Sequence, residues 1–375
     1  MALKGLKVLE LVGLAPAPFC GMILSDFGAT VTRIDKTPHN MLDTLKDGKR
    51  NIALNLKQKE GRQIVRDLCK ISDVLIEPYR PGVMEKLGLG PETLLADNPK
   101  LVYARLTGFG QTGVLAQRAG HDINYMAISG ILSFLGRKNE KPTAPLNLIA
   151  DFAGGGLMCA FGILAALLAR QNTGRGQIVD AAMVEGAAYV SSFLTRSQNL
   201  PIWGKDRGEN MLDTGCFFYD TYETKDGKYM SVGCLEHGFF ETMLNTLGIT
   251  GQLTQFDDNE KGRKILEDIF RTKTQGEWSE IFEKTDSCVF PVLHWSEAPK
   301  HPHNKERNAF LDVKDVIPNP SPKLSETPAI SSVTKKQKDE WENIQEILRE
   351  INYDANKVNK LVKDNVILTN NKGKL

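Results

Sequence analysis

The sequence lacks the features that mark several classes of protein. Its 47 basic and 46 acidic side chains leave a formal net charge of +1, without the basic excess typical of nucleic-acid binding. The segment Met1–Val8 has neither the apolar core of a signal peptide nor an Arg-rich presequence. The six cysteines show no Cys-x-x-Cys spacing, which indicates buried, reduced thiols rather than a zinc site. We therefore expect an intracellular globular protein with no metal ion and no nucleic-acid partner.

No segment predicts a membrane span. The most apolar stretch, Gly154–Ala169, is short and rich in glycine and alanine, and we interpret it as a buried helix. At the other end the chain finishes Gly-Lys-Leu, which shares its last two residues with the peroxisomal Ser-Lys-Leu address.

Strand and helix patterns alternate along the first half of the chain. Short apolar or β-branched runs predict strands at 7–11, 30–34, 51–56, 73–77, 101–106 and 177–180. Helical spacing fills the intervals at 19–27, 59–70, 83–87 and 91–96, and again at 126–134 and 154–170. The alternation predicts an α/β fold with a Rossmann-like parallel sheet, in which ligands bind at the carboxyl ends of the strands.

The second half predicts a smaller domain between two linkers. Strands at 216–224 and 228–234 flank the turn Lys225-Asp-Gly227, which is typical of a hairpin, and helices follow at 239–247 and 261–271. We place a large domain at 1–195, completed by residues 322–375, and a small α+β domain at 213–298. Residues 196–212 and the proline-rich 299–321 are the linkers. Two short helices are expected between 335 and 364.

One motif favours a dinucleotide site but lies in the wrong context. Gly108–Gly113 fits Gly-x-Gly-x-x-Gly after a strand, yet Gly120 interrupts the segment where a helix is required. The motif also follows several strand–helix units, whereas the fingerprint belongs to the first. We therefore expect no nicotinamide or flavin cofactor, only a loop along which a ligand can approach the backbone.

Two residues are candidate proton carriers, each with a structural alternative. His121 lies in the polar segment Gly120–Tyr125, where a histidine is often only structural, although its unperturbed pKa suits proton transfer near neutrality. Asp151 precedes the glycine-rich start of an apolar helix, where the simplest role is that of an N-cap. A carboxylate at a helix start can serve both as a cap and as a catalytic group.

A series of motifs in order resembles the family III CoA-transferase superfamily, and within it the racemase branch. The motifs are Leu14–Cys20, Asp26–Ala29, Gly48–Arg50, Arg80–Gly82, Thr107–Gln111, Gly120–Tyr125, Asp151–Gly156 and Thr173–Gln177. The resemblance covers nearly the whole chain and is densest in residues 1–235. It implies the fold of that family and an interlocked homodimer, whose active site joins one chain's large domain to its partner's small domain.

The resemblance also implies the site. His121 and Asp151 would be the two catalytic bases, with Glu236 orienting the histidine; the residue after that glutamate is usually proline in the racemases and is His237 here. The positions that match CoA or substrate contacts are Lys36, Leu54, Asn55, Leu56, Lys57, Arg80, Lys86, Gly120, Asp122, Ile123, Asn124 and Tyr125. Relatives often carry arginine at 36 and 86, so this chain keeps the charge but not the bidentate geometry.

The reaction implied is proton exchange at C2 of a 2-methylacyl-CoA, in branched-chain fatty acid or bile-acid-type metabolism. No cofactor is needed, because CoA is part of the substrate, and no membrane partner is expected. Peroxisomes, mitochondria or both are the implied location. Asp151 is also the nucleophile position of the family's CoA transferases, so a transferase is the main alternative. A non-catalytic acyl-CoA carrier is another, and a dehydrogenase would require a bound nicotinamide.

Overall fold

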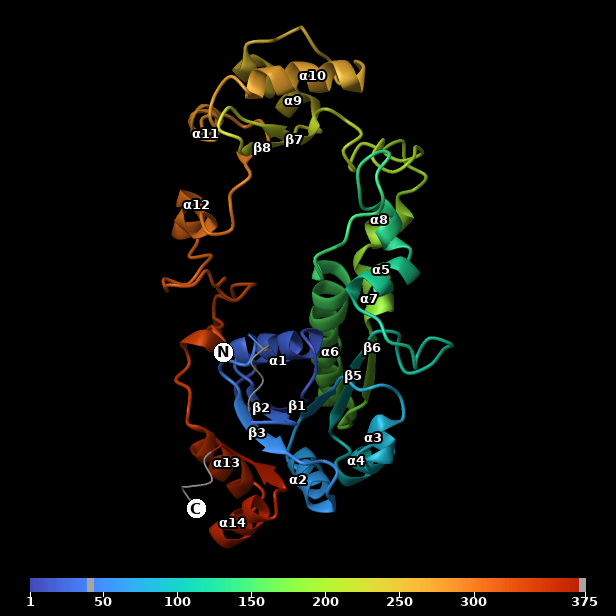
Figure 1. The fold of residues 1–375 in the computed structure, drawn as a ribbon, viewed down its shortest axis with the longest axis vertical. Coiled ribbons are helices and arrows are strands. Elements are labelled where there is room, and N and C mark those ends of the chain that lie inside the picture. The colour runs from blue at the N-terminus through green and yellow to red at the C-terminus, as the bar shows by residue number, and fades with distance from the viewer. Residues whose placement is uncertain (39–43, 371–375) are drawn as a thin grey trace. The chain divides into compact units, whose positions relative to one another are not determined.

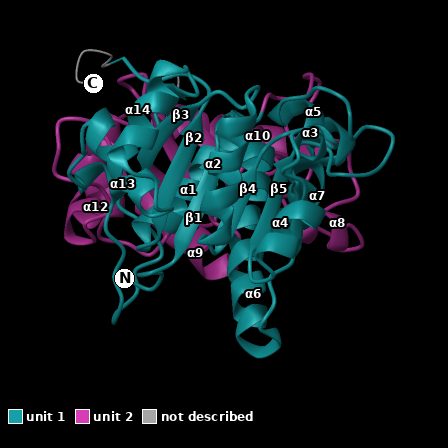
Figure 2. Cartoon of the chain, turned by 90° about the horizontal axis from the view of Figure 1, so that it is seen from below, with its two compact units in different colours: residues 1–131, 145–191, 319–375 teal, residues 132–144, 192–318 magenta. Residues whose placement is uncertain are grey.

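The computed structural model describes residues 1–38 and 44–370. Two compact units divide the chain (Figure 2). Unit 1 comprises residues 1–131, 145–191 and the stretch from Asn319 onward, and unit 2 comprises residues 132–144 and 192–318. Each unit has its own sheet, so each is described separately.

Unit 1 is built on a sheet with the spatial strand order β10-β3-β2-β1-β4-β5-β6. Its strands are β1 Lys7–Leu11, β2 Thr30–Asp35, β3 Arg50–Leu54, β4 Val74–Glu77, β5 Val102–Thr107, β6 Ile178–Ala182 and β10 Ile367–Leu368. Neighbours are parallel except β10 against β3. The predicted parallel α/β sheet is confirmed, whereas the sequence does not predict β10. The order reverses between β1 and β4, and doubly wound sheets bind ligands at such a switch point.

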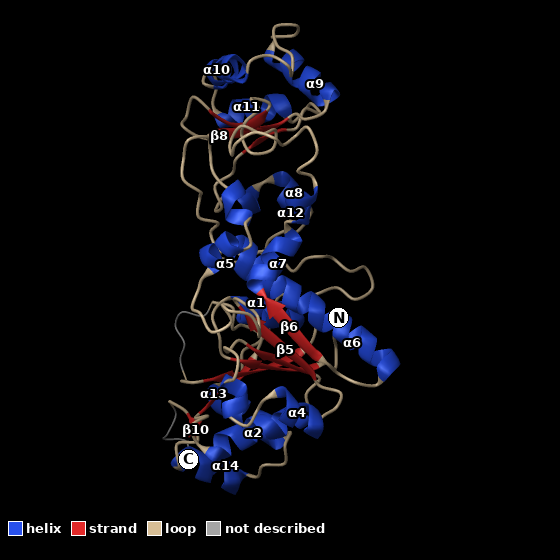
Figure 3. Cartoon of the chain, turned by 90° about the vertical axis from the view of Figure 1, so that its right-hand side faces the viewer, coloured by secondary structure: helices blue, strands red, loops and turns tan. Residues whose placement is uncertain are grey.

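Helices cover both faces of this sheet (Figures 1 and 3). The helices of unit 1 are α1 Pro16–Asp26, α2 Lys59–Lys70, α3 Val83–Lys86, α4 Pro91–Asp97, α5 Asp122–Ile128, α6 Met158–Thr173, α7 Met183–Val190, α13 Glu340–Arg349 and α14 Ala355–Lys363, with the helical turns η2 Leu148–Leu157 and η4 Ser332–Thr334. Helices α1 and α6 lie on one face, and α2, α4, α13 and α14 on the other. The C-terminal helices therefore complete the layer that α2 begins.

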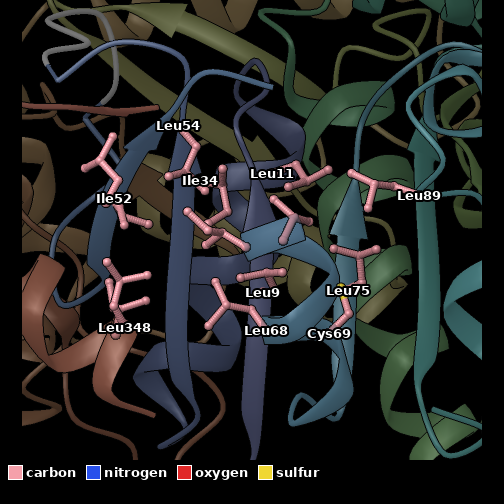
Figure 4. Close-up of a cluster of buried hydrophobic side chains, with 14 of the residues drawn as sticks. Leu9, Leu11, Ile34, Ile52, Leu54, Leu68, Cys69, Leu75, Leu89 and Leu348 are labelled. Atoms are coloured by element: carbon pink, nitrogen blue, oxygen red, sulfur yellow. The ribbon is translucent and has the colours of Figure 1, made fainter. Parts of the chain in front are cut away.

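The larger apolar core lies between the sheet and the α2, α4, α13 and α14 layer (Figure 4). Leu9 and Leu11 of β1 belong to it together with Leu68 of α2, because alternate residues of a strand point to the same face. The opposite face of β1 carries Glu10, which is fully buried. Its Oε2 accepts a hydrogen bond from Lys49 Nζ at 2.7 Å, and Nζ also donates to the Pro18 carbonyl at 2.8 Å. A buried ion pair therefore ties α1 to the sheet.

Unit 2 holds a three-stranded antiparallel sheet in the order β7-β8-β9. Its elements are α8 Ser192–Arg196, β7 Tyr219–Glu223, β8 Tyr229–Gly233, α9 His237–Leu247, α10 Asn259–Phe270, α11 Gln275–Phe282, β9 Val289–Pro291, η3 Ala298–Lys300 and α12 Pro302–Glu306, and η1 Ile131–Phe134 begins at the boundary with unit 1. The predicted hairpin is confirmed, with Gly227 at φ +72° in its turn. Phe217, Phe240 and Phe270 form the centre of its core.

Residues 132–144 correct one expected domain boundary. The sequence places them in the large domain, but they belong to unit 2. The guanidinium of Arg137 pairs with Asp220 at 2.9 Å, and Phe134 packs edge-on against Trp203 with centroids 6.2 Å apart. Lys138 forms a further ion pair with Glu209 at 2.6 Å. Local sequence carries no sign of these partners, which lie far along the chain.

The glycine-rich apolar segment also differs from its expected form. Helical structure runs without a break from Leu148 to Thr173, 26 residues that are long and apolar enough to cross a membrane by length and composition alone. The segment is not a fully buried helix. One face of η2 and α6 is exposed at Leu157, Phe161, Leu164 and Leu168, from 40% at Leu164 to 63% at Leu168. The spacing of these four residues forms a single apolar stripe.

Candidate active site

Two glycines make room for a tyrosine where β5 ends. A Cβ on Gly108 would lie 2.2 Å from the Tyr125 ring, and one on Gly120 would lie 2.7 Å from it. The Tyr125 hydroxyl donates to the Gly120 carbonyl, and its ring packs edge-on against Phe109 with centroids 5.0 Å apart. As expected, no helix of the dinucleotide type follows directly, because turns occupy this loop until α5 begins. Gly108 and Gly120 therefore leave the space that Tyr125 occupies.

His121 is the N-cap of α5, directly before the first helical residue, Asp122. Its backbone is extended, at φ −129° and ψ 175°, and its N–H donates to Asn124 Oδ1 at 3.0 Å, which is half of a capping box. His121 is a non-helical residue ahead of a helix, as the sequence predicts, but the predicted helix start at 126 is wrong. The helix instead starts at Asp122 and stops before Gly130, which has φ +83°. The exposed imidazole therefore stands at a helix N-terminus.

Asp151 lies inside the first turn of η2 rather than at its N-cap, which is Asn147. The N-cap interpretation is therefore wrong. The side-chain amide of Asn147 donates to Asp151 Oδ2 at 2.8 Å, and Asp151 is 7% exposed. Burial raises the pKa of Asp151, the Asn147 hydrogen bond opposes this, the Asp122 charge raises the pKa further and His121 lowers it. The two candidate proton carriers therefore interact electrostatically, and the net effect raises the pKa of Asp151 above its ordinary value.

Asp122 connects the segments that carry the two candidates. Its Oδ1 accepts hydrogen bonds from the N–H groups of Ala150 at 2.7 Å and of Asp151 at 2.8 Å. Helix α7 packs closely against η2 where two glycines meet, because a Cβ on Gly186 of α7 would lie 1.8 Å from the Gly154 carbonyl oxygen. The backbone around Asp151 is therefore held from both sides.

The positions expected to contact CoA follow β2, β3 and β4, of which β2 and β3 are neighbours and β4 lies beyond β1. Lys36 comes after β2, Leu54–Lys57 ends and follows β3, and Arg80 and Lys86 follow β4. All four cations are exposed, and the Lys36 ammonium lies 5.2 Å from the Tyr79 ring centroid. Parallel strands place these positions at one edge of the sheet, beside the switch point. The Leu54 side chain belongs to the core, so only its backbone can meet a ligand.

Comparisons with known proteins identify the family of the chain. A family model described as CoA-transferase family III matches residues 3–339. The chain belongs to CoA-transferase family III. It is 51% identical over 378 residues to the human alpha-methylacyl-CoA racemase, covering 99% of this chain and 98% of that protein. The mouse racemase is 49% identical over 374 residues, covering 98% of both. A solved CaiB/BaiF family protein from Brucella suis has the same fold, with a TM-score of 0.78, 26% identity, and coverage of 93% of this chain and 99% of that one.

The third catalytic candidate of this family III chain, Glu236, lies in unit 2. It is exposed, caps α9 in extended conformation, and its charge raises the pKa of the Cys288 thiol, after burial, the larger cause. His237 is the first residue of α9, a position at which proline also fits, so either residue is compatible with this helix start. Glu236 belongs to unit 2 and His121 to unit 1, and the contact between them stays a prediction.

Asn147 is a site residue that sequence reasoning misses. It adopts φ +59°, a left-handed conformation that asparagine tolerates better than most residues, and follows Leu146 at φ +54°. No motif distinguishes this asparagine from others in the chain. Only the fold shows that its amide reaches the Asp151 carboxylate.

Proposed function

We propose that this chain is an alpha-methylacyl-CoA racemase that interconverts the 2R and 2S epimers of 2-methylacyl-CoA thioesters. The observation that carries the proposal is the pair of proton carriers in unit 1, an exposed imidazole at a helix N-terminus and a buried carboxyl group with a raised pKa. The identity with the human and mouse racemases over nearly the whole chain supports racemisation rather than CoA transfer.

The mechanism moves one proton on each face of C2. In one direction neutral His121 takes the C2 proton, leaving an enolate, and protonated Asp151 returns a proton to the opposite face. In the other direction the Asp151 carboxylate takes the proton and the imidazolium gives one back. The pair thus holds one proton in either resting state, and a raised pKa of Asp151 is the direction that this scheme requires. The reaction needs no cofactor beyond the CoA of the substrate.

The enolate oxygen needs hydrogen-bond donors, and two helix starts are candidates. The N–H groups of Ala150 and Asp151 already donate to Asp122. The first N–H groups of α5, at Asp122 and Ile123, have no acceptor within their own helix. This favours the start of α5, beside His121, as the oxyanion site. Lys36, Lys57, Arg80 and Lys86 would meet the phosphates of CoA, as exposed cations at the carboxyl edge of the sheet.

Deuterium exchange in heavy water tests the function. The wild type should exchange the C2 proton of a 2-methylacyl-CoA from both epimers. His121→Ala should lose exchange from the epimer whose proton faces His121, and racemisation should fall by about 10²- to 10⁴-fold. His303→Ala, a change of an exposed histidine in unit 2, is the control and should behave as the wild type. Normal exchange from both epimers in His121→Ala would refute the two-base scheme.

A CoA transferase would give a different result. Asp151 would then form a mixed anhydride with the acyl group, and CoA would pass to a second carboxylic acid. Mixing a labelled free acid with an unlabelled acyl-CoA detects this transfer. CoA transfer that survives His121→Ala, together with absent C2 exchange in the wild type, would favour the transferase.

A second copy of the chain is the expected partner, because the exposed stripe of α6 has no cover within unit 1. Light scattering should give twice the chain mass of 41.6 kDa. Phe161→Glu places a charge in the stripe and should yield monomers without racemase activity, whereas Lys264→Glu, on an exposed side chain, should not. A wild type that is monomeric and fully active would contradict a site shared between subunits. The peroxisomal or mitochondrial location stays a prediction from the family resemblance, and the terminal Gly-Lys-Leu, which resembles a peroxisomal address, lies outside the described residues.

A further inference from the structure

Asp122 is the most deeply buried charged group beside the candidate proton carriers. It is 1% exposed, although it is the residue directly after the exposed His121. Its Oδ1 accepts the two backbone N–H groups of Ala150 and Asp151, across 28 and 29 positions of the chain. Such burial leaves the carboxylate no surface for a substrate, so the side chain acts within the protein.

The two hydrogen bonds set the spacing of the proton carriers. Asp122 is the first residue of α5 and follows His121, while Ala150 and Asp151 lie in the first turn of η2. One carboxylate oxygen of Asp122 therefore links two segments. They are the start of α5, which carries the imidazole, and the first turn of η2, which carries the Asp151 carboxyl group. A displacement of about 1 Å between reacting groups can lower turnover by about 100-fold, so this joint bears directly on rate.

The charge of Asp122 acts on Asp151 as well. The second oxygen, Oδ2, is buried and has no hydrogen-bond partner among the described residues, so nearby donors do not neutralise the carboxylate fully. Burial is the main cause of the raised pKa of Asp151, and the Asp122 charge adds to it. The opposing influences are the Asn147 amide and His121. Tyr125 is a further titratable neighbour, whose own pKa is raised by burial and by Asp151, lowered by Arg80 and raised by Asp122.

We propose that Asp122 is a positioning residue, which fixes the separation of His121 and Asp151 and biases their shared proton toward Asp151. The inference rests on the proposed racemase function. It assigns Asp122 a role different from the substrate contact that the sequence resemblance implies for this position.

Three substitutions separate geometry from charge. Asp122→Asn keeps an acceptor oxygen for both N–H groups and removes the charge. Asp122→Ala removes both the acceptor oxygen and the charge. Asn147→Ala removes the hydrogen bond that favours the Asp151 carboxylate. Asp26→Asn is the matched control, because Asp26 is also a buried carboxylate of unit 1 that accepts a backbone N–H, from Ser332 at 2.6 Å, but at the C-terminal end of α1.

The measurement is the pH profile of C2 exchange, with kcat and KM. Because the Asp122 charge raises the pKa of Asp151, Asp122→Asn should move the acid limb of the profile to lower pH for the epimer from which the Asp151 carboxylate takes the C2 proton. Asn147→Ala should move it to higher pH, and Asp26→Asn should leave it in place. Asp122→Ala should lower kcat by about 100-fold with little change in KM, since it disturbs the spacing of the catalytic groups.

The outcomes decide the proposal in each case. An Asp122→Asn profile that coincides with that of the wild type overturns it, as does a folded Asp122→Ala with wild-type kcat. If circular dichroism shows that Asp122→Ala is unfolded, the Asp122→Asn and Asn147→Ala profiles decide alone. A wild type without C2 exchange would overturn the racemase function itself, whereas normal wild-type exchange with unshifted variants would overturn only the role of Asp122.

Discussion

Asp151→Asn is expected to lower racemisation by about 10²- to 10⁴-fold, because the amide can neither accept nor return the C2 proton. The substitution preserves the volume of the side chain and leaves an oxygen for the Asn147 amide, which donates to Asp151 at 2.8 Å. The fold around the residue should therefore survive. His121 remains in the variant, so exchange should continue from the epimer whose C2 proton faces the imidazole and stop from the other.

The decisive result is which epimer loses C2 exchange in each variant. His121→Ala and Asp151→Asn should lose exchange from opposite epimers, so each variant serves as the control for the other. Chiral separation of recovered acyl-CoA, followed by mass spectrometry of deuterium at C2, measures both. Equal loss from both epimers in Asp151→Asn would mean that a single base serves both faces, and this would contradict the mechanism.

Much of the fold could be predicted because its signals are local. The helix Lys59–Lys70 begins and ends where apolar spacing predicts, and the hairpin around Gly227 follows from turn chemistry. Strands β1, β2, β4 and β5 are apolar runs bounded by polar or turn residues, which is typical of a buried parallel sheet. A pattern of this kind fixes the elements before any long-range contact is known.

The features that the sequence missed depend on partners far along the chain. Arg137 pairs with Asp220 across 83 positions, and this contact assigns residues 132–144 to unit 2. Asp122 meets the backbone of Ala150 across 28 positions, so no local rule distinguishes it from a surface aspartate. The short strand β10 pairs with β3 from the far end of the chain. His121 and Asp151 were identified through family resemblance, whereas the groups that hold them required the structure.

Lys49→Met is expected to lower the free energy of unfolding by about 3–5 kcal/mol, because it leaves a buried carboxylate without its cation. Glu10 is fully buried, and its Oε1 has no hydrogen-bond partner among the described residues, so Lys49 supplies the contact that offsets the desolvation of the charge. Gly21 packs against the same carboxylate, since a Cβ there would lie 1.8 Å from Oε2. The packing around the Glu10 carboxylate thus leaves no room for a water molecule in place of the Lys49 ammonium.

A double variant separates the contribution of the ion pair to stability from that of side-chain packing. Glu10→Gln combined with Lys49→Met removes both charges and should recover most of the stability, because the desolvation penalty disappears with the carboxylate. Lys264→Met is the control, since Lys264 pairs with Asp268 at 2.8 Å on an exposed helix face, where an ion pair contributes about 0–1 kcal/mol. Urea unfolding followed by circular dichroism measures the three variants against the wild type. If Lys49→Met costs no more than Lys264→Met, the buried pair does not hold α1 against the sheet.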